Sequence, residues 1–163
     1  MKKFGLLLLL FTANFGRLKA DEGISTYTQD AFVYSSMGSI ASLIMFPIVG
    51  IGFRNQSGNI GSDISIQGTG IPGIFLAKGN ATVLYYPKPN LKRQFYFGAG
   101  AGIMTVNLDE TAAFSPELVV GKQYCPDTGG RRFFEAQITP YIMNSQGEGT
   151  FVPGLILRYG IGF

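Results

Sequence analysis

Apolar and polar residues alternate along the chain from residue 46 to its last residue. The final stretch is the clearest example, since Leu155, Leu157, Tyr159 and Ile161 fall on one face and Arg158 falls among glycines on the other. Successive side chains of a β-strand point to opposite faces, so this period of two predicts strands. Seven segments follow it: 47–54, 60–68, 75–86, 94–104, 114–124, 132–142 and 150–163.

Clusters of Gly, Pro, Asn and Asp separate the seven segments, and these residues supply the special dihedral angles of turns. An eighth strand is expected before residue 47, either within 28–36 or within 39–46. A short membrane helix over 37–53 is the competing interpretation, but the glycines and Pro47 in that stretch disfavour it. The sequence therefore predicts an all-β chain of about eight antiparallel strands.

The two faces of these strands differ in chemistry. One face is apolar, whereas the other is rich in glycine and carries three acids and three bases: Arg54, Asp63, Lys78, Glu117, Glu135 and Arg158. Buried charges persist only when they are paired. We therefore expect the six to form a network inside a closed barrel. On a soluble sheet, the same charges would face water instead.

Aromatic residues of the apolar face gather near the segment ends. Phe75 and Tyr85 are ten residues apart, as are Phe114 and Tyr124. A tilted strand crosses a bilayer in about 9–11 residues, with aromatic side chains at both interfaces. This spacing favours a transmembrane β-barrel over a secreted soluble sheet. The predicted aromatic girdle consists of Phe53, Phe75, Tyr85, Phe95, Phe114, Tyr124, Phe134 and Phe151.

Lys122 departs from this pattern, because strict alternation puts it on the apolar face. Two interpretations remain open. The residue is close to a strand end, where its ammonium could reach the interface. Alternatively, a bulge near Pro116 or Gly121 shifts the phase of the strand.

The first twenty residues have the order of a secretory signal peptide. Lys2 and Lys3 precede an apolar run from Phe4 to Phe11, and small residues lead to Ala20. We expect a signal peptide over 1–20, a tail over 21–27 and the barrel over 28–163. The leader holds four of the thirteen basic residues and no acid, so nine basic and ten acidic residues follow it. That balance argues against a nucleic-acid partner.

Catalytic and metal chemistry is restricted by composition. The chain has no His and a single Cys, Cys125, which excludes imidazole catalysis, His metal sites and an internal disulfide. We expect no cofactor, no metal and no enzymatic activity. Glu117 and Glu135 lie on neighbouring predicted strands and leave one acid–base alternative open. Neutralisation by Arg54, Lys78 or Arg158 is the interpretation that we favour.

The last strand resembles the C-terminal assembly signal of bacterial outer-membrane barrels, in which an aromatic final residue closes an alternating apolar strand. The residues that carry it are Leu155, Leu157, Tyr159, Ile161 and Phe163. The resemblance implies that the barrel assembly machinery is a partner during biogenesis and that outer-membrane lipid surrounds the barrel.

Other stretches resemble short, uncharacterised outer-membrane proteins of chlamydiae and their environmental relatives. They are Pro47–Arg54, Leu84–Pro87, Gln94–Gly98 and Phe114–Glu117. This resemblance implies location in the bacterial outer membrane, after export through the inner membrane, and no known activity.

A barrel of eight strands is just wide enough for side chains to fill its interior. We therefore expect an integral outer-membrane protein with a filled lumen, structural or exposed at the surface, whose two termini face the periplasm. A narrow pore for small solutes and a secreted soluble β-sheet binding protein are the alternatives. No ligand is predicted from the sequence.

Overall fold

The computed structural model describes residues 29–40, 46–71, 74–106, 112–126, 130–145, 148–152 and 154–163. The signal peptide and tail expected over 1–27 lie outside these ranges. The strands are β1 (Gln29–Ile40), β2 (Phe46–Ser57), β3 (Ile60–Ile71), β4 (Ile74–Tyr85), β5 (Arg93–Val106), β6 (Ala112–Tyr124), β7 (Arg131–Ile138), β8 (Tyr141–Ser145), β9 (Glu148–Val152) and β10 (Leu155–Gly162). None of the described residues forms a helix that is long and apolar enough to cross a membrane.

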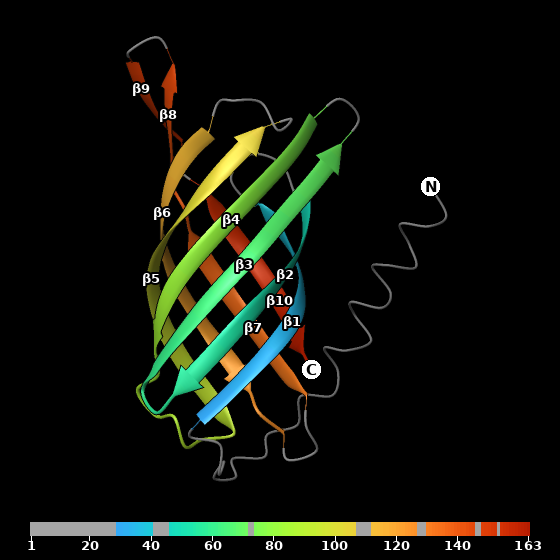
Figure 1. Ribbon diagram of the computed structural model, residues 1–163, viewed down its shortest axis with the longest axis vertical. Helices are drawn as coiled ribbons and strands as arrows, with labels where there is room; N and C mark the ends of the chain where they lie inside the picture. The colour runs from blue at the N-terminus through green and yellow to red at the C-terminus, as the bar shows by residue number, and fades with distance from the viewer. Residues whose placement is uncertain are drawn as a thin grey trace, which may run out of the picture.

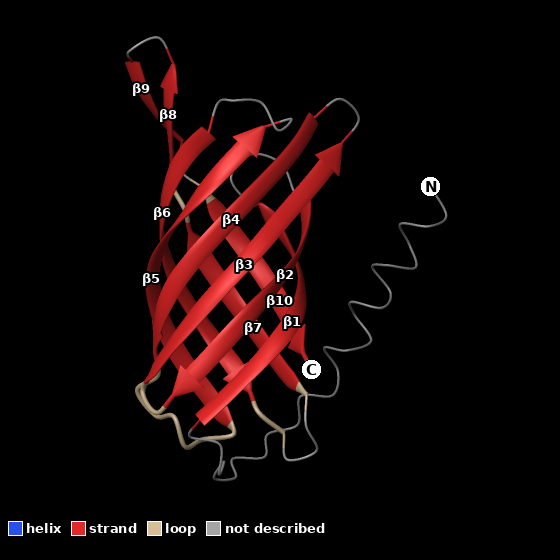
Figure 2. Ribbon diagram, in the orientation of Figure 1, coloured by secondary structure: helices blue, strands red, loops and turns tan. Residues whose placement is uncertain are grey.

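The strands close into one antiparallel barrel (Figures 1 and 2). Neighbours follow the order β5, β4, β3, β2, β1, β10, β7, β6, and pairing of β5 with β6 completes the circle. The wall has eight strands because β8 continues the register of β7 on β6, while β8 and β9 form a hairpin above the rim in Figure 1. The predicted fold class, an all-β antiparallel barrel of about eight strands, is confirmed.

Several strand limits differ from those that the alternation predicts. The first strand is Gln29–Ile40, so the alternative over 39–46 is wrong, and the membrane helix over 37–53 is replaced by β1 and β2. The segments 132–142 and 150–163 are each interrupted. Each interruption contains a proline, Pro140 or Pro153 in the sequence, which has no backbone N–H for the ladder.

One end of the barrel carries the β2–β3, β4–β5 and β6–β7 connections and the end of the chain, and we call it the terminal end. The β2–β3 turn has only two residues, Gly58 and Asn59. Gly58 has a φ of 58°, as two-residue hairpin turns require at their first position. The backbone N–H of Phe163 donates to Val33 O at 3.0 Å, which ties the chain end to β1.

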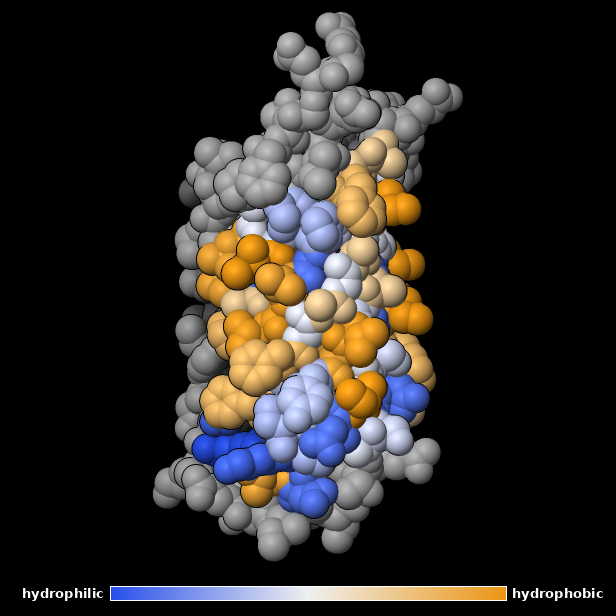
Figure 3. Space-filling view, turned by 90° about the vertical axis from the view of Figure 1, so that its left-hand side faces the viewer, coloured by the Kyte–Doolittle hydropathy of each residue, from blue (hydrophilic) through white to orange (hydrophobic). Residues whose placement is uncertain are grey.

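The outer face of the wall is apolar and the inner face is polar. Val83 is 60% exposed and Ile138 and Leu157 are also exposed, whereas Glu135 is 0% exposed and Arg158 is buried. On the face that Figure 3 shows, apolar residues cover the middle of the barrel and hydrophilic residues gather toward its lower end. This arrangement is the reverse of a soluble sandwich, whose apolar faces pack together.

Lys122 is exposed on the outer face near the end of β6. The register of β6 is constant along both of its neighbours, so the bulge considered near Pro116 or Gly121 is wrong. The Lys122 ammonium lies 4.9 Å from the centroid of the Phe95 ring. A cation over an aromatic face is favourable at an interface.

Inside the barrel, large rings lie over glycines of the neighbouring strand. Tyr34 is opposite Gly52, Tyr96 is opposite Gly121, and Phe133 is opposite Gly160. A Cβ at any of the three glycines would overlap the facing ring. The glycines of the inner face therefore admit aromatic side chains into a lumen that is too narrow for two bulky neighbours.

Candidate functional site

The centre of the lumen holds two arginines and two acids in one cluster. Arg54 Nε lies 2.8 Å from Asp63 Oδ2, and Arg54 Nη2 lies 2.9 Å from Glu135 Oε2. Arg158 forms an ion pair with Glu135, and its Nη2 lies 3.6 Å from Asp63 Oδ1. All four side chains are buried. Each arginine contacts both acids. The two positive and two negative charges make the cluster electrically neutral.

Tyrosine hydroxyls complete the coordination of the two acids. Tyr34 donates to Asp63 Oδ1 at 2.8 Å, and Tyr96 donates to Glu135 Oε2 at 2.6 Å. The Arg54 guanidinium carbon lies 4.2 Å from the centroid of the Phe133 ring, which covers it from one side. Buried charges with this many hydrogen bonds are compensated for the loss of water.

A second ion pair lies in the part of the lumen away from the terminal end. Lys78 Nζ is 2.8 Å from Glu117 Oε2 and donates to Thr139 Oγ1 at 2.9 Å. Glu117 also accepts hydrogen bonds from Asn80 and Thr82. This cluster is also neutral, with one base and one acid.

Ser65 and Asn80 join the two clusters. Arg158 Nη1 donates to Ser65 Oγ at 3.1 Å, Ser65 donates to Asn80 Oδ1 at 3.1 Å, and Asn80 Nδ2 donates to Glu117 Oε1 at 3.2 Å. The connected side chains come from every strand of the wall: Tyr34 of β1, Arg54 of β2, Asp63 of β3, Lys78 of β4, Tyr96 of β5, Glu117 of β6, Glu135 of β7 and Arg158 of β10. We call this set the lumen network.

Other side chains fill both ends of the lumen. Toward the terminal end, Gln123 donates to Gln56 Oε1, and Leu84, Tyr86 and Val119 pack with Tyr96. At the opposite end a pocket of about 20 Å³ lies among Gln67, Thr69 and Met104 and their neighbours. That volume holds about one water molecule.

The two glutamates that left acid–base chemistry open are held apart. Glu135 is opposite Gly121, so Glu117 lies four residues farther along β6, roughly 13 Å away at the rise of a strand. Each carboxylate is bound by its own cations, Glu117 by Lys78 and Glu135 by two arginines. A shared-proton pair is therefore not formed.

Sequence reasoning selected the six charged members of the lumen network, and the structure brings all six together in two clusters. It did not select the neutral members. Their signal was available in part. Ser65, Asn80, Thr82 and Gln137 share the parity of charged members on the same strands, and Thr139 continues that of Glu135. Tyr34 and Tyr96 lie on β1 and β5, which supply none of the six charged members. Phe133 is buried among the charges as well, so the inner face is not only small and polar.

The aromatic girdle residues lie on the outer face wherever their side chains are described. The exposed members are Phe53, Phe75, Tyr85, Phe95, Phe114 and Phe134, and Tyr124 is half-buried. The Phe151 side chain lies outside the described part. The C-terminal strand presents Leu155, Leu157, Ile161 and Phe163 to the outside, with Tyr159 half-buried on the same face.

No protein-family model matches the chain, and no curated protein matches its sequence. Among solved structures, the chain is similar to the crystal structure of Neisserial surface protein A (NspA). The TM-score is 0.58 at 13% sequence identity, over 86% of this chain and 98% of NspA. At that identity the likeness shows a shared fold.

Proposed function

We propose that this chain is an integral protein of the bacterial outer membrane, a β-barrel with a filled lumen that serves a structural or surface role without catalysis. The observation that carries the proposal is the inverted distribution of polarity. Apolar side chains cover the outside of a closed sheet, while Arg54, Glu135 and Arg158 are buried and paired inside it.

Hydrocarbon is the solvent that fits such an outer face. Monomeric soluble proteins rarely expose large contiguous apolar surfaces, because removing apolar area from water lowers the free energy of the protein. Membrane barrels have an apolar outer band, aromatic girdles and a polar interior. The secreted soluble alternative would leave Ile51, Ile64, Ile66, Val83 and Leu118 in water.

Biogenesis and orientation belong to the same proposal. The leader-like residues 1–20 support export through the inner membrane. The outward row that ends in Phe163 supports delivery by the barrel assembly machinery. The terminal end then faces the periplasm. The resemblance to chlamydial outer-membrane proteins and the fold shared with NspA, a surface protein by name, support this location.

A filled lumen disfavours the narrow pore, and the separation of Glu117 from Glu135 disfavours an enzyme. The lumen network crosses the barrel from wall to wall, and the pocket beside Lys78 has room for about one water molecule. The lack of His supports the same conclusion.

Fractionation and conductance together test the proposal. We expect the protein to stay in envelopes washed with carbonate or high salt, and unheated and heated samples to migrate differently on gels. In planar bilayers the purified protein should give no steady conductance. Release by carbonate would support the secreted alternative, and stable channels would support the pore. Lipid-modifying activity that disappears in a folded E117Q variant would contradict the absence of catalysis.

A further inference from the structure

The basic side chains that the structure describes outside the lumen lie at the terminal end. Acidic side chains that the structure describes, Asp63, Glu117 and Glu135, lie in the lumen. Five basic side chains lie outside it, in the β4–β5 turn or at the adjoining ends of β5, β6 and β7: Lys88, Lys92, Arg93, Lys122 and Arg132. Among the side chains that the structure describes, the outer rim over β5, β6 and β7 at this end therefore carries only positive charge, whereas the lumen network is neutral.

Strand register arranges three of these cations among aromatic residues. In one row across the wall, Tyr124 is opposite Arg93 on one side and opposite Arg132 on the other. In the next row, nearer the middle of the barrel, the order is Phe95, Lys122, Phe134 and Tyr159. Direct cross-strand neighbours are about 5 Å apart and diagonal neighbours about 7–8 Å apart at Cβ. Lys122 is thus a diagonal neighbour of both Arg93 and Arg132, which lie on either side of Tyr124.

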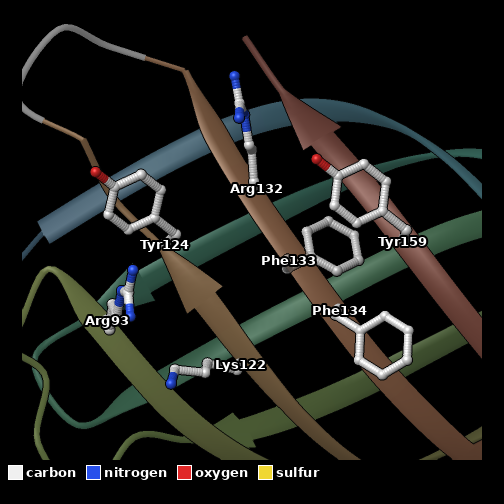
Figure 4. A pocket seen from close by; sticks show the side chains of 7 residues that line it. All are labelled: Arg93, Lys122, Tyr124, Arg132, Phe133, Phe134 and Tyr159. Carbon is white, nitrogen blue, oxygen red and sulfur yellow. The ribbon is translucent and has the colours of Figure 1, made fainter. Parts of the chain in front are cut away.

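A pocket of about 130 Å³ lies among these side chains (Figure 4). Arg93, Lys122, Tyr124, Arg132, Phe134 and Tyr159 line it from the outside, together with Phe133 of β7. The Arg93 guanidinium carbon lies 5.8 Å from the centroid of the Tyr124 ring. The pocket thus combines three cations with two phenol groups on four strands, β5, β6, β7 and β10.

A second, larger hollow adjoins the pocket. It has a volume of about 590 Å³ and shares Arg93 and Lys122 with the first. Leu91, Phe95 and Phe97 give it an apolar wall. A ligand that occupies both would carry an anionic group next to an apolar part.

We propose that the pocket binds the phosphate headgroup of an anionic phospholipid in the leaflet around the terminal end, with its glycerol and upper acyl chains in the larger hollow. This proposal rests on the proposed membrane location. Guanidinium groups match phosphate oxygens with paired hydrogen bonds, and the Lys122 ammonium adds a point charge. A zwitterionic lipid brings an ammonium of its own, which three cations repel, so the pocket selects for net negative charge.

Native mass spectrometry of the full chain in a neutral detergent tests the proposal, with phosphatidylglycerol and phosphatidylcholine offered at equal concentration. We expect the wild type to retain phosphatidylglycerol preferentially. The R93Q, K122Q and R132Q variants should each lower that preference about fivefold, as expected for one cation at a charged surface. The triple variant should lose it.

R131Q is the matched control, since Arg131 is next to Arg132 in the sequence but is buried and lines neither the pocket nor the larger hollow. It removes the same charge and should leave the lipid preference within about twofold. An equal loss of preference in R131Q would indicate a general electrostatic attraction rather than a site, and would overturn the proposal. Equal retention of the two lipids by the wild type would also overturn the proposal, and that result does not depend on any variant. Displacement of the lipid by inorganic phosphate at equal concentration would assign the pocket to free phosphate instead.

The same samples separate this inference from the membrane proposal. Insertion into neutral phosphatidylcholine vesicles is scored by the mobility difference between unheated and heated samples, which also shows that each variant is folded. A protein that inserts but shows no lipid preference would overturn the lipid site alone. A protein that does not insert would overturn the membrane location.

Discussion

Glu135 is bound by four other side chains of the lumen. Its carboxylate binds Arg54 and Arg158 and accepts further hydrogen bonds from Tyr96 and Gln137 at 2.6 and 2.9 Å. Asp63 is then the only other acid in the central cluster, so two arginines depend on these two carboxylates. The energy of the cluster therefore depends on its neutrality, because a lone buried charge is costly.

Glu135→Gln keeps the shape of the side chain and removes its charge. We expect the free energy of unfolding to fall by about 3–5 kcal/mol, since one arginine is left uncompensated in a buried site. Urea titration of the barrel in lipid vesicles measures the change. The double variant E135Q/R158Q restores neutrality and should lose less than the sum of the two single variants. Additive losses would show that the two side chains do not act as a pair.

The rings that face glycines predict a second effect at single residues. In Gly121→Ala the new methyl group would overlap the Tyr96 ring, which should cost about 1–3 kcal/mol of unfolding free energy. Gly79→Ala is the matched control, because Gly79 is outward-facing and nothing lies within 4 Å of its added Cβ. The control should be neutral or slightly stabilising. Equal losses in both variants, by the same urea titration, would contradict the close approach.

Among the hairpins, β2–β3 has the tightest connection that the structure describes. Two residues join strands of twelve residues each, and Gln56 Nε2 donates to Gly58 O at 3.2 Å across the turn. In a closed barrel, a shift of one residue here would exchange the inner and outer faces of a whole strand. The turn therefore fixes which side chains of β3 enter the lumen, Asp63 and Ser65 among them.

Gly58→Ala tests this turn. Nothing lies within 4 Å of an added Cβ, so the only cost is the positive φ, roughly 1–2 kcal/mol for an L-residue. Gly58→Asn should lose less, because Asn adopts this conformation more readily. Unfolding in urea gives both values, and equal stability of wild type and G58A would contradict the strained turn.

The whole molecule has an apolar outer face and an ionic interior, and the chemistry of the outer face changes along the axis of the barrel. On the face in Figure 3 the middle of the barrel is apolar, and hydrophilic residues gather toward the terminal end. The exposed aromatic residues Tyr85 and Phe95 and the basic residue Lys122 lie near that end. Charge on the lipid face of a membrane barrel costs most at the midplane and little near the interfaces. For a soluble barrel, depth would have no meaning.

Ile66 and Ile60 allow a direct test of that difference. Both face outward on β3, with 64% and 55% of their surface exposed, but Ile66 is near the middle of the strand and Ile60 is at its terminal end. Ile66→Lys should lower the free energy of unfolding in vesicles by about 2–4 kcal/mol, and Ile60→Lys by about 0–1 kcal/mol. Equal, near-zero effects would indicate water around the barrel and contradict the membrane proposal.

The face assignments could be derived from sequence because they depend on local geometry. Alternation fixed which side of each strand is apolar, and the identities of Arg54, Glu135 and Arg158 marked the other side. Strand limits were less accessible. Pro140 and Pro153 stand in the sequence where β7 is interrupted before β8 and where β9 is interrupted before β10. By contrast, β2 continues to Ser57 through residues that are common in turns. In β2, pairing with the neighbouring strands overrides the local preference for a turn.

The sequence by itself determined an all-β chain with one apolar and one ionic face, since side-chain direction in a strand follows from position alone. Only the tertiary structure decided which partners meet, because register and closure are properties of neighbouring strands. Closure brings Arg54 to Glu135, 81 positions away, and puts Phe133 over an arginine. It also aligns Arg93, Lys122 and Arg132 around one pocket. The position of a residue within its strand decides which face of the sheet its side chain lies on. The pairing of that strand with its neighbours decides which side chains it contacts.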